Sequence, residues 1–106
     1  MIKVSIFYPN NGGHFDMDYY LNKHMPMSIE RLSAHPGFKS VSVERGIGGG
    51  APNTEPEYIA ICHYVFDSVE SYIAAFTPHE AILRGDMPNY TDIEIIFQFS
   101  EIMISR

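Results

Sequence analysis

The 106-residue chain has a single cysteine, no tryptophan and only 7 basic residues against 13 acidic ones. Because Cys62 has no partner, no disulfide can form within the chain, which fits a reducing compartment and predicts a cytoplasmic protein. The net charge of −6 and the lack of any basic cluster disfavour nucleic acids and anionic membrane surfaces as partners. The longest apolar-leaning stretch, Tyr58 to Phe66, is too short to cross a bilayer, and the N-terminus does not resemble a signal peptide.

The remaining composition is typical of one globular domain that spans residues 1–106. Hydrophobic residues make up 45% of the chain, charged residues 19% and aromatic residues 13%. A chain of this size buries only about 60–70% of the surface of its unfolded state, so a partner subunit would add useful burial.

Hydrophobic periodicity predicts the element order strand, helix, strand, strand, helix, strand. The first strand covers residues 2–8, and the first helix opens at Phe15 or Asp16 and stops at His35-Pro36-Gly37. A second strand around residues 41–45 is followed by a glycine-rich connection at 46–53 and a third strand at about 57–66. The second helix starts at a capping box at 67–70, restarts with Thr77 as cap and ends at Gly85. The apolar face of the last strand consists of Ile93, Ile95, Phe97 and Phe99.

This order predicts an α+β, ferredoxin-like βαββαβ fold with a four-stranded antiparallel sheet and both helices on one face. Strand 57–66 carries apolar residues on both faces: Tyr58, Ala60, Cys62, Tyr64 and Phe66 on one, and Ile59, Ile61 and Val65 on the other. Both faces of this strand should therefore be buried. A small chain without a second helical layer can achieve that by pairing its sheet with a second copy of itself, so we expect a homodimer.

The first helix is the most informative segment. Leu21, Met25, Ile29 and Leu32 are expected to form its buried stripe, with Tyr20 and His24 on one flank. Tyr20 and His24 are four residues apart, so a phenol and an imidazole lie one turn apart on the same face, where they could bind a small compound and move a proton. Pro26 should bend the helix near His24 because it lacks a backbone N–H and clashes with the carbonyl of Asn22.

Other candidate residues have weaker signals. His63 lies on the Ile59–Ile61–Val65 face of its strand and is either a satisfied core histidine or, if the pocket lies between that face and the first helix, a neighbour of His24. Cys62 points to the opposite face and is expected to act as a small hydrophobic residue. His79 lies near a helix start. The five histidines show no His-x-His or His-x-x-x-His spacing, so no metal-binding motif is expected, and a metal site would have to be assembled from residues distant in the sequence.

The pattern Phe15-Asp16-x-x-Tyr19-Tyr20-x-x-x-His24-x-Pro26 resembles the signature of the EthD family, named for its link to ethyl tert-butyl ether degradation. The stretch Phe76 to His79 and the stretch Gly85 to Asp92 are similar to the family's C-terminal pattern. The resemblance covers nearly the whole chain and implies a dimeric α+β barrel, nominally grouped with oxidoreductases. It adds His79, which is either a ligand contact or a solvated residue at a helix start. It also adds Asp86 and Tyr90, which either shape the pocket mouth or only fix the turn into the last strand.

Together these features predict a small dimeric enzyme that holds an aromatic or lactone-like metabolite between the first helix and the sheet. His24 would transfer a proton and Tyr20 would donate a hydrogen bond, while His63, His79, Asp86 and Tyr90 would contact the ligand. No cofactor motif is present. Two alternatives stay open: a non-catalytic carrier of a hydrophobic intermediate, and haem binding through His24 or His63.

Overall fold

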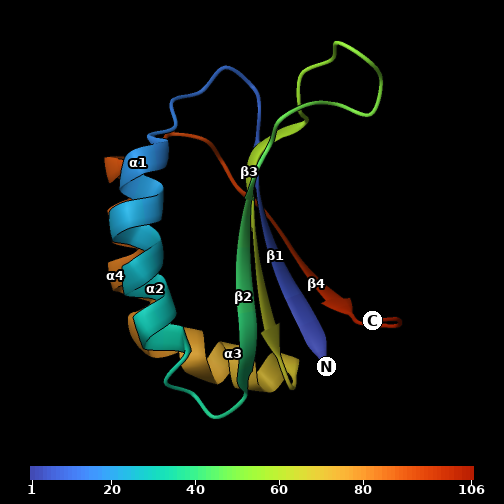
Figure 1. Cartoon of the computed structure of the whole chain (residues 1–106). Coiled ribbons are helices and arrows are strands. Elements are labelled where there is room, and N and C mark those ends of the chain that lie inside the picture. The colour runs from blue at the N-terminus through green and yellow to red at the C-terminus, as the bar shows by residue number, and fades with distance from the viewer.

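The computed structural model describes all 106 residues and places four antiparallel strands under a layer of helices (Figure 1). The strands are β1 (Ile2–Pro9), β2 (Phe38–Arg45), β3 (Tyr58–Phe66) and β4 (Ile96–Glu101), in the spatial order β2-β3-β1-β4. The helical segments are α1 (Met17–Tyr19), the π-helical turn η1 (Tyr20–His24), α2 (Met25–Leu32), α3 (Val69–Phe76), the 3₁₀ turn η2 (Thr77–His79), α4 (Glu80–Asp86) and the 3₁₀ turn η3 (Met87–Asn89). The ferredoxin-like fold class is confirmed.

The two faces of the sheet have different environments. Val4 on β1 lies opposite Tyr64 on β3 and Phe99 on β4, and these side chains share the face toward the helices. The neighbouring positions Ser5 and His63 share the other face, which carries no helix (Figure 1). The core therefore lies between the helices and the Ala60–Cys62–Tyr64–Phe66 side of β3, all four of which are buried.

The first helix contains one turn of π-helix, Tyr20–His24, which ends two residues before Pro26. The backbone N–H of Met25 donates to the carbonyl of Tyr20, five residues earlier, and Pro26 follows at the start of α2. A π turn holds one extra residue, so the side chains before it are rotated relative to those of α2. At His24, where a bend was predicted, the helix has this π turn, and Pro26 accounts for it because this residue cannot make the regular helical hydrogen bond.

The rotation changes which residues are buried. Tyr20 and His24 face the core, whereas Leu21 is 45% exposed. The predicted stripe is correct for Met25 and Leu32, which are buried, and Ile29 is half-buried. It is wrong for Leu21, because the π turn contains one more residue than the regular helical spacing on which the prediction depends.

The second helical region is longer than its sequence signals indicate. Ser68 caps α3 by accepting from the N–H of Ser71, as a helix start at this point requires. Thr77 does not act as the expected cap; its hydroxyl donates to the carbonyl of Ile73 at 2.7 Å, so the chain continues from α3 through η2 into α4. The helix also continues past Gly85 to Asp86, which brings the Asp86 carboxylate toward the first helix.

The last strand begins later than expected, at Ile96. Phe97 and Phe99 lie on the helix side of the sheet, but they are 41% and 39% exposed because β4 is an edge strand. Ile93 is buried in the segment before the strand. No helix of the chain has the length and hydrophobicity that a bilayer crossing demands.

Leucine-to-alanine substitutions at two positions of the first helix can test which of its side chains are buried. Leu32→Ala removes a side chain that is 1% exposed and should reduce the free energy of unfolding by about 2–5 kcal/mol. Leu21→Ala, in the same helical segment, should cost less than about 0.5 kcal/mol. Urea denaturation of both variants measures the difference, and equal losses would contradict the register described here.

Candidate functional site

His24 and Asp86 form a hydrogen-bonded pair between the first helix and the end of α4. His24 Nδ1 lies 2.9 Å from Asp86 Oδ2, and both side chains are largely shielded from solvent. Because Nδ1–H donates to the carboxylate, Nε2 is the nitrogen left to accept a proton. This arrangement fixes both the tautomer and the orientation of the imidazole.

The surroundings keep the imidazole neutral and the carboxyl ionised at neutral pH. Burial lowers the pKa of His24 below its ordinary value of 6.5, and the hydrogen bond and charge of Asp86 offset part of this shift. Burial alone would raise the pKa of Asp86, but hydrogen bonds from Tyr19, Asn89 and His24 outweigh it, so the pKa lies below its ordinary value. The pair therefore combines a neutral base with an anionic group that orients it.

Two further side chains hold the carboxylate in place. Tyr19 donates its hydroxyl proton to Asp86 Oδ1 at 2.6 Å, and Asn89 Nδ2 donates to the same oxygen at 3.0 Å. Tyr19 is part of the resemblance motif, but its position on the helix does not by itself indicate this partner. Its part in the network depends on the approach of Asp86 from a segment 67 residues further along the chain.

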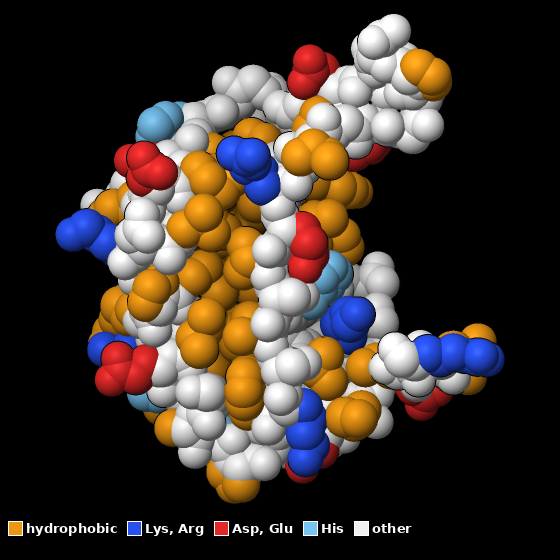
Figure 2. Space-filling model, viewed as in Figure 1, with side chains coloured by type: hydrophobic (Ala, Val, Ile, Leu, Met, Phe, Trp, Pro, Cys, Tyr) orange, Lys and Arg blue, Asp and Glu red, His pale blue; other side chains and the backbone are white.

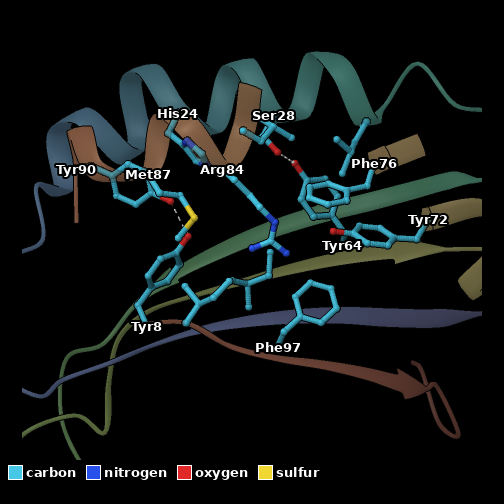
Figure 3. A pocket seen from close by; sticks show the side chains of 14 residues that line it. Tyr8, His24, Ser28, Tyr64, Tyr72, Phe76, Arg84, Met87, Tyr90 and Phe97 are labelled. Carbon is cyan, nitrogen blue, oxygen red and sulfur yellow. Dashed lines mark hydrogen bonds between the residues drawn. The ribbon is translucent and has the colours of Figure 1, made fainter. Parts of the chain in front are cut away.

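A cavity of about 60 Å³ lies beside His24, between the helices and the sheet (Figure 3). Its lining is mainly hydrophobic, with 11 hydrophobic residues among 14. Hydrophobic side chains gather between the helical layer and the strands in the space-filling view (Figure 2). The lining residues are Ile6, Tyr8, His24, Ser28, Leu32, Tyr64, Tyr72, Phe76, Leu83, Arg84, Met87, Tyr90, Ile95 and Phe97.

Two pairs of hydroxyl groups contribute polar atoms to this cavity. The hydroxyls of Tyr8 and Tyr90 lie 2.9 Å apart, and the Ser28 hydroxyl lies 2.6 Å from that of Tyr64. Burial raises the pKa of Tyr8 to about 12, although the hydrogen bond with Tyr90 acts in the opposite direction. The phenols are therefore protonated at neutral pH and can donate hydrogen bonds to a ligand.

Tyr20 does not line the cavity. It is fully buried, its ring stacks near that of His24 with centroids 6.0 Å apart, and its hydroxyl has no hydrogen-bond partner. The expected donation from Tyr20 to a substrate does not fit this placement. Tyr8 and Tyr90 line the cavity and can reach a ligand, whereas Tyr20 stacks against the His24 ring outside the cavity lining.

His63 lies on the opposite sheet face and cannot approach His24. The two histidines could meet only if the first helix covered the His63 side of β3. The helices instead cover the Cys62 side. His63 Nε2 lies 3.1 Å from Glu44 Oε1, and its Nδ1 lies 2.8 Å from the Ser5 hydroxyl. It borders a separate, more polar hollow of about 340 Å³ on the open face.

The other candidates divide between the cavity and its surroundings. Tyr90 lines the cavity, and its ring centroid is 4.6 Å from that of His24. His79 lies outside, with Nδ1 3.4 Å from Arg31 Nη1. Cys62 is buried beneath the helices, and burial raises the pKa of its thiol to about 12, which fits a small hydrophobic residue.

Neither metal nor haem fits the residues described. No group of three or more His, Cys, Asp and Glu side chains is placed to hold a metal ion. The cavity beside His24, about 60 Å³ in volume, would have to open far more for a porphyrin than for a small metabolite. Both ring nitrogens of His63 are engaged by Ser5 and Glu44, so neither is free to ligate iron.

Comparison with known proteins identifies close relatives. Residues 14–94 match the EthD domain. An EthD-like protein from Ralstonia eutropha shares 40% identity over 99% of this chain and 94% of its own, with a TM-score of 0.90. An ethyl tert-butyl ether degradation family protein from Bacillus halodurans shares 23% identity over 97% of this chain and 99% of its own, with a TM-score of 0.70.

A more distant structure shares the fold. SnoaB, a cofactor-independent oxygenase from Streptomyces nogalater, is 14% identical over 98% of this chain and 93% of its own, with a TM-score of 0.58. No curated protein matches the chain. The matched domain covers most of the sequence, and the Ralstonia protein is similar over nearly its full length. This chain belongs to the EthD family.

Proposed function

We propose that the protein binds a small apolar metabolite, aromatic or lactone-like, in the cavity beside His24 and that His24 removes or returns a proton. The observation that carries this proposal is that His24 lines a mainly hydrophobic cavity while its other ring nitrogen is hydrogen-bonded to Asp86 behind the lining. Buried acid–base pairs with shifted pKa values, placed at such cavities, are typical of functional sites.

The chemistry follows from the orientation of the imidazole. Nδ1 donates to Asp86, so Nε2 accepts a proton from a carbon or hydroxyl of the ligand. The Asp86 carboxylate stabilises the imidazolium that forms. Within the Tyr8–Tyr90 pair, the phenol that accepts the hydrogen bond keeps its own proton, which it can donate to an oxygen on which negative charge develops. Reactions that begin with proton loss, such as isomerisation, are open to such a pair, whereas an oxidation would also need an electron acceptor from outside the chain.

A carrier role is the second candidate. The cavity is lined mainly by hydrophobic side chains and could hold a hydrophobic intermediate without converting it. In that case the imidazole would contribute little to binding, whereas a base must be present for turnover. Loss of His24 should therefore abolish turnover if the protein is an enzyme, and should leave ligand binding nearly unchanged if it is a carrier.

We also propose that the open sheet face pairs with a second copy of the chain. Ile59, Ile61 and Val65 are only half-buried there, and Ile96 is 50% exposed on the same face. The 46–57 loop and the C-terminal segment project on this side of the sheet and frame the face (Figure 1). A second sheet would remove these apolar side chains from water.

Catalysis by His24 predicts a large loss on substitution. Metabolites that co-purify with the protein, identified by mass spectrometry, supply the substrate for the assay. His24→Ala should lower kcat about 10²–10⁴-fold, whereas His14→Ala, at an exposed position, should leave it unchanged. Full turnover by His24→Ala would refute the catalytic assignment, and ligand retention without turnover by the unmodified protein would establish the carrier.

The Asp86 contact predicts a directed pKa change. Because the carboxylate raises the pKa of His24, Asp86→Asn should lower it further below 6.5. The acid limb of the pH–rate profile, where the base becomes protonated, should shift to lower pH in this variant. Histidine NMR titration of both proteins measures the pKa directly, and an upward shift in Asp86→Asn would contradict the electrostatics described.

Pairing of the open faces predicts a dimer at micromolar concentration. Ile61→Glu places a charge at the centre of the open face and should yield monomers in analytical ultracentrifugation. Ile73→Glu, on a helix position that is 50% exposed, is the matched control and should sediment as the unmodified protein. An unmodified protein that sediments as a stable monomer would disprove this assembly.

A further inference from the structure

Arg84 is the only lysine or arginine among the cavity-lining residues. It lies on α4, and its side chain extends from that helix across the space between His24 and Phe97 (Figure 3). Its guanidinium carbon is 5.9 Å from the centre of the Phe76 ring. A permanent positive charge therefore lies over an aromatic ring at the solvent-exposed edge of a mainly hydrophobic cavity.

Most of the hydrogen-bonding capacity of Arg84 remains free. Its Nε donates to Glu80 Oε2 at 2.9 Å, in an (i, i+4) pair of side chains that are 55% and 47% exposed. Such exposed pairs contribute only about 0.3–0.5 kcal/mol. The guanidinium has five N–H groups and Glu80 occupies one of them, so the Nη groups can bind a second acceptor.

The cavity supplies no acceptor of matching charge. None of its lining residues is an aspartate or glutamate, and Asp86 is occupied by His24, Tyr19 and Asn89. The whole chain carries a net charge of −6, so an acidic ligand gains no attraction from the overall charge. Attraction of an acid to this cavity must therefore come from Arg84 itself.

We propose that Arg84 binds the carboxylate of the ligand, so that the substrates of this site are small apolar carboxylic acids, aromatic ones included. The inference rests on the proposed function and names its substrate class. The carboxylate pairs with the Nη groups, and the apolar body lies among the hydrophobic lining within reach of His24. Arg84 thus decides which ligands enter, while the His24–Asp86 pair carries out the proton transfer.

The test compares benzoate with benzamide, its neutral analogue of nearly the same shape, by NMR titration of the backbone amides. Benzoate should bind about 2- to 5-fold more tightly, since a charge pair with a half-exposed guanidinium contributes up to about 1 kcal/mol. The shifted amides should surround Tyr8, His24 and Tyr90. Arg84→Gln should remove the preference for benzoate, Arg84→Lys should retain part of it, and Lys39→Gln, which removes a charge from the other face, should leave it unchanged.

Three results would overturn the inference, and they differ in what else they affect. Equal binding of benzoate and benzamide would refute selection for acids and leave the cavity as a small-molecule site. Benzoate shifts confined to Lys3 and Lys39, with weaker binding in Lys39→Gln, would place the acid on the open face instead. Failure of both compounds to bind at millimolar concentration would contradict this inference and also count against the proposed function.

Discussion

The hydrogen bond between His24 and Asp86 joins the two halves of the chain at the point on which the site depends. It links the first helix to the end of α4, across 62 residues of sequence. Tyr19 and Asn89 complete the contact from both sides, so the carboxylate is held by groups from each segment. Without this hydrogen bond, the imidazole beside the cavity would lose its defined tautomer and orientation.

The junction itself requires an irregular helix. A regular helix through Tyr20 would bury Leu21 and leave His24 on the flank, whereas the π turn before Pro26 rotates His24 into the core. The turn places a titratable group where burial lowers its pKa, and the continuation of α4 past Gly85 provides the carboxylate that compensates. Departures from regular structure at such positions are typical of functional sites.

The fold could be predicted from the sequence because it depends on local periodicity. The alternation of side chains in β1 and β3 is a short-range pattern, and so are the capping signals before the helices. Once the order of the elements is known, only a few topologies are compatible with it. The exposure of Leu21 could not be predicted, because nothing in the hydrophobic spacing marks a π turn. Thr77 and Gly85 also have residue types that normally begin and end helices, yet here the chain continues through both.

The candidate site could be predicted only in part, because it is assembled from distant segments. His24, Asp86 and Tyr90 carry motif signals, and the structure brings them together. Tyr8 and Arg84 carry none; they reach the cavity through strand register and helix placement. His63 had the right residue type on the wrong face of β3, and the spacing of residues along one strand does not reveal which face the helices cover.

The most direct measurement is a crystal structure of the protein purified from its own host, with the ligand that it carries. The account predicts density for a small apolar molecule in the cavity, with one of its atoms within hydrogen-bond distance of His24 Nε2. Density at the open face alone, or a cavity closed by its own side chains in protein that carries a stoichiometric metabolite, would contradict it.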